Sequence, residues 1–382
     1  MSRIAMVSLL LPFVYSGVSA QATERDSAGV RIVGQLPGAR VKLGPALFQI
    51  DGSEDGHEPF FRLNGDGITA HAGGLVVANG GTELRFYTPT GGLRKSAGGR
   101  GGGPGEFQLI TWVQRIRGDS IEVYDGRLRR ISVWTRDGER ARETPVSGGM
   151  AARAPGAILA VPALPAGALP DGQLLFTSSV SFLPNAGGIA RARGWLLRGS
   201  PAGPTRDTIA PIAVIDYGPL GSDGRNPPGP VAFMRMLRRA ASAEDFAITE
   251  GDAYRIEQFD AAGGRTSIRV QRNLEPVRAA DRAAWKAEPG RPEPVFPSVF
   301  PAYSNLFRDT AGRLWAELFK RPNASTAAWD VFDAKGRLLA TVEVQPSVLL
   351  VTGDAARVYG IHKDDLDVQT IQAFDVPALI RR

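Results

Sequence analysis

Cysteine is absent from this chain of 382 residues, and histidine occurs only at His57, His71 and His362. Without cysteine the protein has no disulfide, no thiolate nucleophile and no thiol for a lipid anchor, so its stability must come from packing. Catalytic zinc sites commonly use two or three histidines, and the three present form no HxH or HExxH pair. These absences argue against thiol enzymes and zinc enzymes.

Other signatures of catalysis and of nucleic-acid binding are also missing. No GxSxG motif announces a serine nucleophile, and the glycine-rich segments at 98–105 and 199–204 lack the GxxxxGK[ST] order of a phosphate loop. The formal net charge is +6, but arginines alternate with acids and no block of five like charges occurs. We therefore expect neither a catalytic residue of these kinds nor a nucleic-acid partner.

One long apolar run is present, and it lies at the N-terminus. Arg3 precedes an apolar segment from Ile4 to Tyr15, and small residues follow at Val18, Ser19 and Ala20. This order predicts a secretory signal peptide over residues 1–20, which is too short in its apolar part to span a bilayer. No later segment reaches about 18 apolar residues. We expect a periplasmic or secreted protein that is not an integral membrane protein.

The remaining sequence repeats a strand pattern, and the repeat organises the chain. A glycine or aspartate-glycine turn, a strand, a polar loop, and a second strand ending in an aromatic recur along it. The first of these strands is found in six segments: 74–78, 120–124, 173–177, 245–249, 313–318 and 356–361. The second is clearest in four: 84–92, 131–139, 254–264 and 329–337. Spacings of about 45 residues at both ends of the series suit a four-stranded blade.

The middle units are longer than this spacing. Their extra length lies in alanine-, proline- and glycine-rich segments, which we interpret as surface insertions at 148–171, 184–194 and 217–230. A further insertion, from Pro276 to Lys286, has helical composition with Asp281 near its start. It predicts one short helix near residues 278–287.

A glycine-rich connection, Gly98 to Phe107 with the sequence GGRGGGPGEF, follows the alternating run from Thr82 to Leu93. Strand, turn, strand and then GxxGxGPGEF resembles the NHL-type repeat of β-propellers. More specifically, the chain is similar to the secreted bacterial six-bladed propellers of that group over residues 28–376. The resemblance implies an all-β, six-bladed propeller with four-stranded antiparallel blades, forming a single domain over residues 21–382.

The last repeat lacks a strand that the N-terminus could supply. After the strand from Val368 to Phe374 only eight residues remain, and Pro377 makes another ladder strand there unfavourable. We predict that the strand from Val30 to Val33 joins this blade and closes the ring. Closure removes the exposed sheet edges that otherwise promote aggregation.

The loops after the first recurrent strand should share one face of such a propeller, and binding concentrates in such loops. These loops contain Asn79, Asp364 and Asp365, together with most of the predicted ligand-binding residues. With the glycine-rich connection included, the predicted ligand-binding residues are Arg100, Glu106, Asp125, Glu250, Asp252, Lys320 and His362.

The acids of this set allow two interpretations. Calcium takes six to eight oxygen ligands, and Asp125, Glu250, Asp252 and Asp364 could contribute some of them. Turn aspartates more commonly bond their own backbone, and we favour that interpretation, expecting no metal and no cofactor.

These observations favour a binding or interaction module, monomeric, whose loop-rich face engages a protein, a peptide or a glycan. A metal-dependent propeller lyase or lactonase-type hydrolase is the alternative. A structural partner in an envelope complex is a third possibility that the sequence does not separate from the first.

Overall fold

The computed structural model describes residues 22–53, 56–147, 157–182, 188–203, 206–218, 231–260, 263–285 and 294–381. Over these ranges the protein is built almost wholly of β-strands, as the sequence predicts. The predicted signal peptide at 1–20 lies outside the described residues. No helix in the described ranges is long and apolar enough to cross a membrane.

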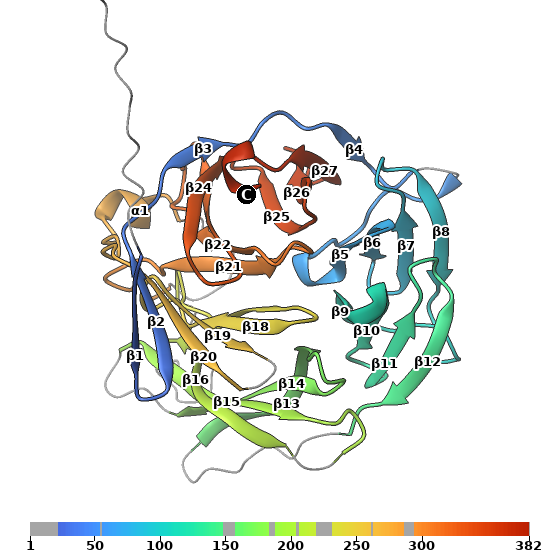
Figure 1. The fold of residues 1–382 in the computed structure, drawn as a ribbon, viewed down its shortest axis with the longest axis horizontal. Helices are drawn as coiled ribbons and strands as arrows, with labels where there is room; N and C mark the ends of the chain where they lie inside the picture. The colour runs from blue at the N-terminus through green and yellow to red at the C-terminus, as the bar shows by residue number, and fades with distance from the viewer. Residues whose placement is uncertain are drawn as a thin grey trace, which may run out of the picture.

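Six antiparallel sheets surround a common centre, which gives the described chain a β-propeller architecture (Figure 1). Four consecutive strands pair antiparallel in each of the first five sheets and three do so in the sixth, and N-terminal strands extend sheets 4, 5 and 6. Sheet 1 contains β5 (Ile68–His71), β6 (Gly74–Asn79), β7 (Glu83–Tyr87) and β8 (Leu93–Gly98). Sheet 2 contains β9 (Ile110–Arg115), β10 (Ile121–Asp125), β11 (Arg130–Trp134) and β12 (Arg140–Pro145). Sheet 3 contains β13 (Ala157–Ala168), β14 (Leu174–Phe182), β15 (Ala190–Gly199) and β16 (Asp207–Tyr217).

The second half of the chain continues in the same way. Sheet 4 contains β17 (Arg238–Ala241), β18 (Asp245–Thr249), β19 (Arg255–Asp260) and β20 (Arg265–Val270). Sheet 5 contains β21 (Tyr303–Arg308), β22 (Leu314–Leu318), β23 (Ala327–Phe332) and β24 (Leu338–Val344). Sheet 6 contains β25 (Val348–Gly353), β26 (Arg357–Lys363) and β27 (Gln369–Asp375). The recurrent strand recognised in the sequence is the second strand of every sheet.

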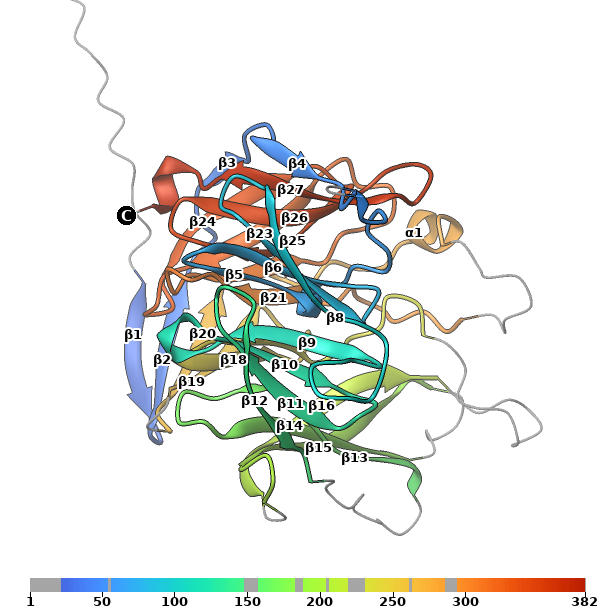
Figure 2. The ribbon, with the colours of Figure 1, turned by 90° about the vertical axis from the view of Figure 1, so that its right-hand side faces the viewer.

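Short helical segments interrupt this pattern. The α-helix α1 (Ala279–Ala283) falls within the segment where the sequence predicts a short helix, and Figure 2 shows it projecting from one face of the molecule. The 3₁₀ turns are η2 (Gly65–Gly67), η3 (Arg117–Asp119) and η4 (Ala378–Ile380). Arg321 holds α1 against the loop after β22, because its guanidinium donates to both carboxylate oxygens of Asp281 at 2.8 Å.

The N-terminal segment pairs with three different sheets, which corrects the predicted closing strand. β1 (Thr23–Ser27) and β2 (Val30–Gln35) form a hairpin, and β2 lies parallel to β20 in sheet 4. β3 (Arg40–Lys42) lies parallel to β24, and β4 (Phe48–Ile50) lies antiparallel to β27. The prediction that Val30–Val33 pairs with Val368–Phe374 is therefore wrong.

Buried side chains explain why β4 takes that position. Ile50 of β4 is only 1% exposed and packs in the hydrophobic cluster between sheets 6 and 1. Gln35 of β2 is instead committed to the turn before β24, since its side chain donates to Gly336 O at 2.9 Å and accepts from Leu338 N at 2.6 Å. β2 is thus anchored between sheets 4 and 5, away from β27.

Sheet 3 corrects a second prediction. The segment interpreted as an insertion at 148–171 contains β13, and the one at 184–194 contains the start of β15. Pro162 and Pro165 are tolerated in β13 because it is an edge strand whose pairing with β14 is interrupted by register shifts on both sides. The third predicted insertion begins at Tyr217, the last residue of β16, and beyond residue 218 it lies outside the described residues.

Hydrophobic clusters fill the space between neighbouring sheets. Clusters lie between sheets 1 and 2, 2 and 3, 3 and 4, 4 and 5, and 5 and 6, and another joins sheet 6 to sheet 1. The wedge between sheets 5 and 6 contains Trp315 and Trp329, both fully buried. Burial of these wedges is the main source of stability that such an architecture offers.

Candidate functional site

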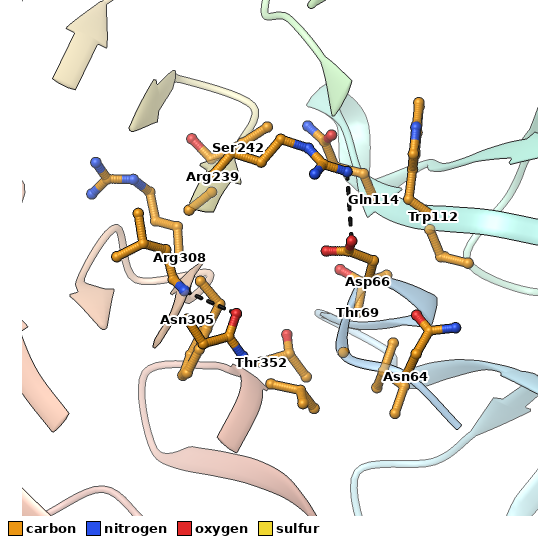
Figure 3. Close-up of a pocket in the computed structure, with 18 of the residues that line it drawn as sticks. Asn64, Asp66, Thr69, Trp112, Gln114, Arg239, Ser242, Asn305, Arg308 and Thr352 are labelled. Atoms are coloured by element: carbon orange, nitrogen blue, oxygen red, sulfur yellow. Dashed lines mark hydrogen bonds and ion pairs between the residues drawn. The ribbon is translucent and has the colours of Figure 1, made fainter. Parts of the chain in front are cut away.

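The first strands of the sheets face a cavity of about 760 Å³ at the centre of the molecule (Figure 3). β5, β9, β17, β21 and β25 provide most of the wall, and Ala166 is the contribution of β13. The volume falls in the range typical of small-molecule sites. The lining is mixed, with arginine, acidic and amide side chains beside aliphatic ones.

An ion pair spans this cavity. Asp66, in the turn η2 before β5, lies 3.5 Å from the guanidinium of Arg239 on β17, and these elements belong to sheets 1 and 4, which stand opposite each other (Figures 1 and 3). Asn64 caps η2 by accepting a hydrogen bond from Gly67 N at 2.9 Å, which fixes the turn that presents Asp66. Arg239 also donates from Nε to the carbonyl of Ala166.

Arg238, the neighbour of Arg239, lines the same cavity without an ion-pair partner among the described residues. Its guanidinium contacts the sulfur of Met236 at 3.7 Å. Burial lowers the pKa of Arg238 below its ordinary value, and the charges of Asp66 and Glu317 oppose that shift. The site therefore holds a partly buried cation that no carboxylate contacts directly.

Glu317, at the end of β22, is the buried acid of the same region. Its carboxylate accepts a hydrogen bond from the Ser304 hydroxyl at 2.8 Å, and the residue is 8% exposed. Burial raises the pKa of Glu317, while Ser304, Lys320 and Arg238 act in the opposite direction. Glu317 and Arg238 influence each other through space but form no direct ion pair.

A second cavity of about 570 Å³ adjoins the first. The two share Asn64, Gly65, Glu317 and Leu349 in their walls. The second is lined further by Lys320, Ser347, Lys363, Asp364 and Gln369. Lys320 donates from Nζ to Pro346 O at 2.7 Å. We call the region where the two cavities meet, around Glu317 and Asn64, the cavity mouth.

The residues predicted from the sequence fall into separate places. Arg100 and Glu106 lie in one exposed loop, where Glu106 accepts from Gly103 N at 2.7 Å. Asp125 borders this loop and is 1% exposed. It accepts four backbone hydrogen bonds, from Gln108, Leu109, Arg127 and Leu128.

Glu250 and Asp252 lie together at the end of β18, on another sheet. Glu250 accepts from Ala213 N at 2.7 Å, and Asp252 lies 3.4 Å from Arg255. His362 belongs to β26, between residues that line the second cavity. Of the seven predicted residues, Lys320 alone appears in the described lining of either cavity.

Sequence reasoning missed the charged and hydroxyl residues that line the central cavity. Asp66, Arg238, Arg239 and Ser304 lie on or just before first strands, whereas the prediction was drawn from loops after second strands. The adjacent pair at 238–239 stands upstream of the recurrent strand at 245–249. The sequence signal that could have identified these residues is a charged residue at or just before the start of the first strand of a sheet.

Metal-ligating groups, the buried histidine and the hydroxyl groups are the other chemical features of the described residues. No three histidine, aspartate or glutamate side chains among them gather in a group that could hold a metal ion. Buried His71 lies 3.7 Å from Asp119, but this pair is at the opposite end of β5 from Asp66. The hydroxyl of Ser242 bonds Asp245, and that of Thr352 accepts from Ala70 N.

Comparison with known proteins finds no matching family model and no matching curated protein. Solved structures do match, at low identity. A candidate exported protein from Bacteroides fragilis matches at 10% identity over 90% of this chain and 98% of its own, with a TM-score of 0.46. Virginiamycin B lyase from Staphylococcus aureus matches at 8% over 86% and 99%, with a TM-score of 0.39. A gluconolactonase from Xanthomonas campestris matches at 14% over 88% and 100%, with a TM-score of 0.40. These likenesses assign neither a propeller subgroup nor a function to this chain.

Proposed function

We propose that this protein is an exported binding module, a six-bladed propeller of NHL-like type whose ring is closed by β4, and that it binds its ligand at the cavity mouth. The domain comprises residues 21–382, follows a cleaved signal peptide, and acts as a monomer in the periplasm or outside the cell. The ligand is a segment of a protein, peptide or glycan that reaches into the cavity from the loop-rich face carrying α1.

The observation that carries this proposal is the pair of incompletely matched charges, Arg238 and Glu317, in the wall of the cavity. A charge removed from water without a direct partner costs several kcal/mol. Such a cost is expected where a ligand supplies the missing partner. Lys320 and Asp364 at the adjoining cavity add further polar contacts for a ligand of extended shape.

Binding is favoured over catalysis by the surroundings of the hydroxyl groups. Ser304 is bonded to Glu317, and Ser242 and Thr352 are bonded to groups of the protein. None of the three histidines lines either cavity in the described part of the chain. The hydroxyls therefore have no imidazole within the cavity wall to act as a general base, and the carboxylate of Glu317 is the base that an enzyme would have to use on Ser304.

The test uses a substitution that narrows the cavity mouth. Ser347 is exposed and lines the second cavity, and within the described ranges only its backbone takes part in a hydrogen bond. We expect Ser347→Trp to weaken binding to any hit from peptide and glycan arrays at least tenfold, because the indole would obstruct the mouth. Ser27→Trp, on the exposed strand β1, is the matched control and should bind like the wild type.

Two results would contradict the proposal. Equal binding by both tryptophan variants would place the ligand elsewhere. Conversion of a bound peptide or glycan into product, followed by mass spectrometry, would indicate an enzyme instead of a binding module.

A further inference from the structure

The ion pair between Asp66 and Arg239 is weak. Its single contact is 3.5 Å long, and the Asp66 side chain is 59% exposed. Exposed ion pairs of this kind contribute little stability, typically below about 1 kcal/mol. Arg239, in contrast, is held in place by its second bond to Ala166. Loss of Asp66 from the pair would leave a positioned guanidinium facing the cavity.

Two guanidinium groups share this one carboxylate. Asp66 is the acid that acts most strongly on Arg238, and it also contacts Arg239. Glu317 is the second acid near Arg238, but its carboxylate is bonded to Ser304. The other arginines of the cavity wall have their own acids, Arg115 with Asp119 and Arg308 with Asp245. Positive charge is therefore least compensated at residues 238–239.

We infer that the cavity binds a carboxylate-bearing ligand, whose carboxylate displaces Asp66 and is held by Arg238 and Arg239. This inference rests on the proposed function and names the chemical group that the site recognises. Guanidinium groups match carboxylates in shape and donate paired hydrogen bonds to them. The cavity volume suits a ligand of a few residues or sugar units. In the free protein, Asp66 occupies the anion position from the opposite sheet.

The experiment compares ligands that differ only in the carboxylate. Tri-alanine is compared with tri-alanine amide, and tri-galacturonate with a neutral galactose trisaccharide, each titrated calorimetrically into the full chain. The first pair tests a peptide terminus as the source of the carboxylate, and the second tests an acidic sugar. We expect at least tenfold tighter binding of the acid in one pair, weakening as salt is raised from about 0.05 to 0.5 M.

Substitutions then assign the effect to residues. Arg238→Gln and Arg239→Gln should each weaken binding of the acid at least tenfold, and Arg239→Lys should weaken it less because it keeps the charge. Asp66→Asn should strengthen binding several-fold, because it removes the internal competitor. Arg25→Gln, on exposed β1, is the control and should leave affinity unchanged. Melting temperatures show whether each variant folds. If Arg238→Gln does not fold, the single variants Asp66→Asn and Arg239→Lys still test the inference.

Several outcomes would overturn the inference. Equal binding of acid and neutral partner in both pairs would exclude carboxylate recognition, as would weaker binding by Asp66→Asn. Inorganic phosphate binding as tightly as the acids would indicate a general anion site. The two proposals can be told apart: neutral ligands that bind and are blocked by Ser347→Trp would refute carboxylate recognition and leave the binding module intact, whereas equal binding by Ser347→Trp and Ser27→Trp would contradict the binding site itself.

Discussion

At the scale of single residues, the buried acids of this protein differ in how many hydrogen bonds and ion pairs stabilise their carboxylates. Asp330 is fully buried and bonded to Arg272, Tyr303 and Thr341. Glu122 on β10 is 7% exposed, yet no group in the described ranges donates a hydrogen bond to it. Burial raises the pKa of Glu122 to about 7, and the charge of Arg142 opposes the shift. Glu122 is therefore a site where pH acts on stability.

We predict that stability falls as pH rises from 4.5 to about 7 because of this residue. The unfolded chain loses the Glu122 proton near pH 4.5, whereas the folded protein keeps it to about 7. Its stabilising effect is complete below pH 4.5 and lost above 7, with a difference of about 3 kcal/mol. Urea unfolding of wild type and Glu122→Gln at several pH values measures it. The variant should lose the part of the fall that Glu122 causes and keep the part due to Glu317, whose pKa burial also raises, while exposed Glu244→Gln should retain the whole fall. Identical profiles for wild type and Glu122→Gln would disprove the assignment.

At the scale of elements, short N-terminal strands complete the outer edges of three sheets. β4 has only three residues, but it is the strand that connects the beginning of the described chain to its end. Its partner β27 would otherwise present a free edge, which favours aggregation. The N-terminal strand that pairs with β27 therefore determines how the beginning of the described chain is joined to its end.

A cysteine crosslink tests this pairing without interference, because the chain has no other cysteine. Gln49 and Gln372 are direct register partners in β4 and β27. We predict that Gln49→Cys with Gln372→Cys forms a disulfide under mild oxidation and raises the melting temperature, since it closes a very long loop. Mass spectrometry of tryptic peptides detects the bond.

The matched control moves the first cysteine to β2. Arg31 lies in β2 beside Thr266 of sheet 4, so Arg31→Cys with Gln372→Cys should stay reduced. A disulfide in the control but not in the Gln49 variant would restore Val30–Val33 as the closing strand.

At the scale of the whole molecule, the inner strands contact one another in a cycle. β5 contacts β9, β9 contacts β13, and the series continues through β17, β21 and β25 back to β5. Each sheet is apolar on both faces and depends on two neighbours for burial. Unfolding one sheet would expose the adjoining faces of two others.

We therefore predict one cooperative unfolding transition for the protein. Circular dichroism and tryptophan fluorescence should give the same urea midpoint, because Trp112 and Trp134 belong to sheet 2 while Trp315 and Trp329 belong to sheet 5. The calorimetric enthalpy should equal the van't Hoff enthalpy. Two separated transitions would contradict a single domain.

The sequence by itself determined the all-β class, the second strand of every sheet and the position of the helical segment. These follow from local patterns, since alternation, turn residues and recurring aromatics are written within a few residues of one another. Asp125 shows this in part: a turn aspartate was favoured as a partner of its own backbone, and the hydrogen bonds from Arg127 and Leu128 are of that kind, whereas those from Gln108 and Leu109 come from a distant segment.

Tertiary structure alone decided which N-terminal strand pairs with β27 and which charges meet at the centre. Both Val30–Val33 and Phe48–Ile50 are short apolar strands with buried side chains, and they differ in where they pack: Ile50 lies in the cluster between sheets 6 and 1, whereas Gln35 of β2 is bonded to the turn before β24. Asp66 and Arg239 stand 173 residues apart in the chain. Nothing local couples them; they meet because six sheets around one axis place the starts of opposite inner strands face to face across a cavity.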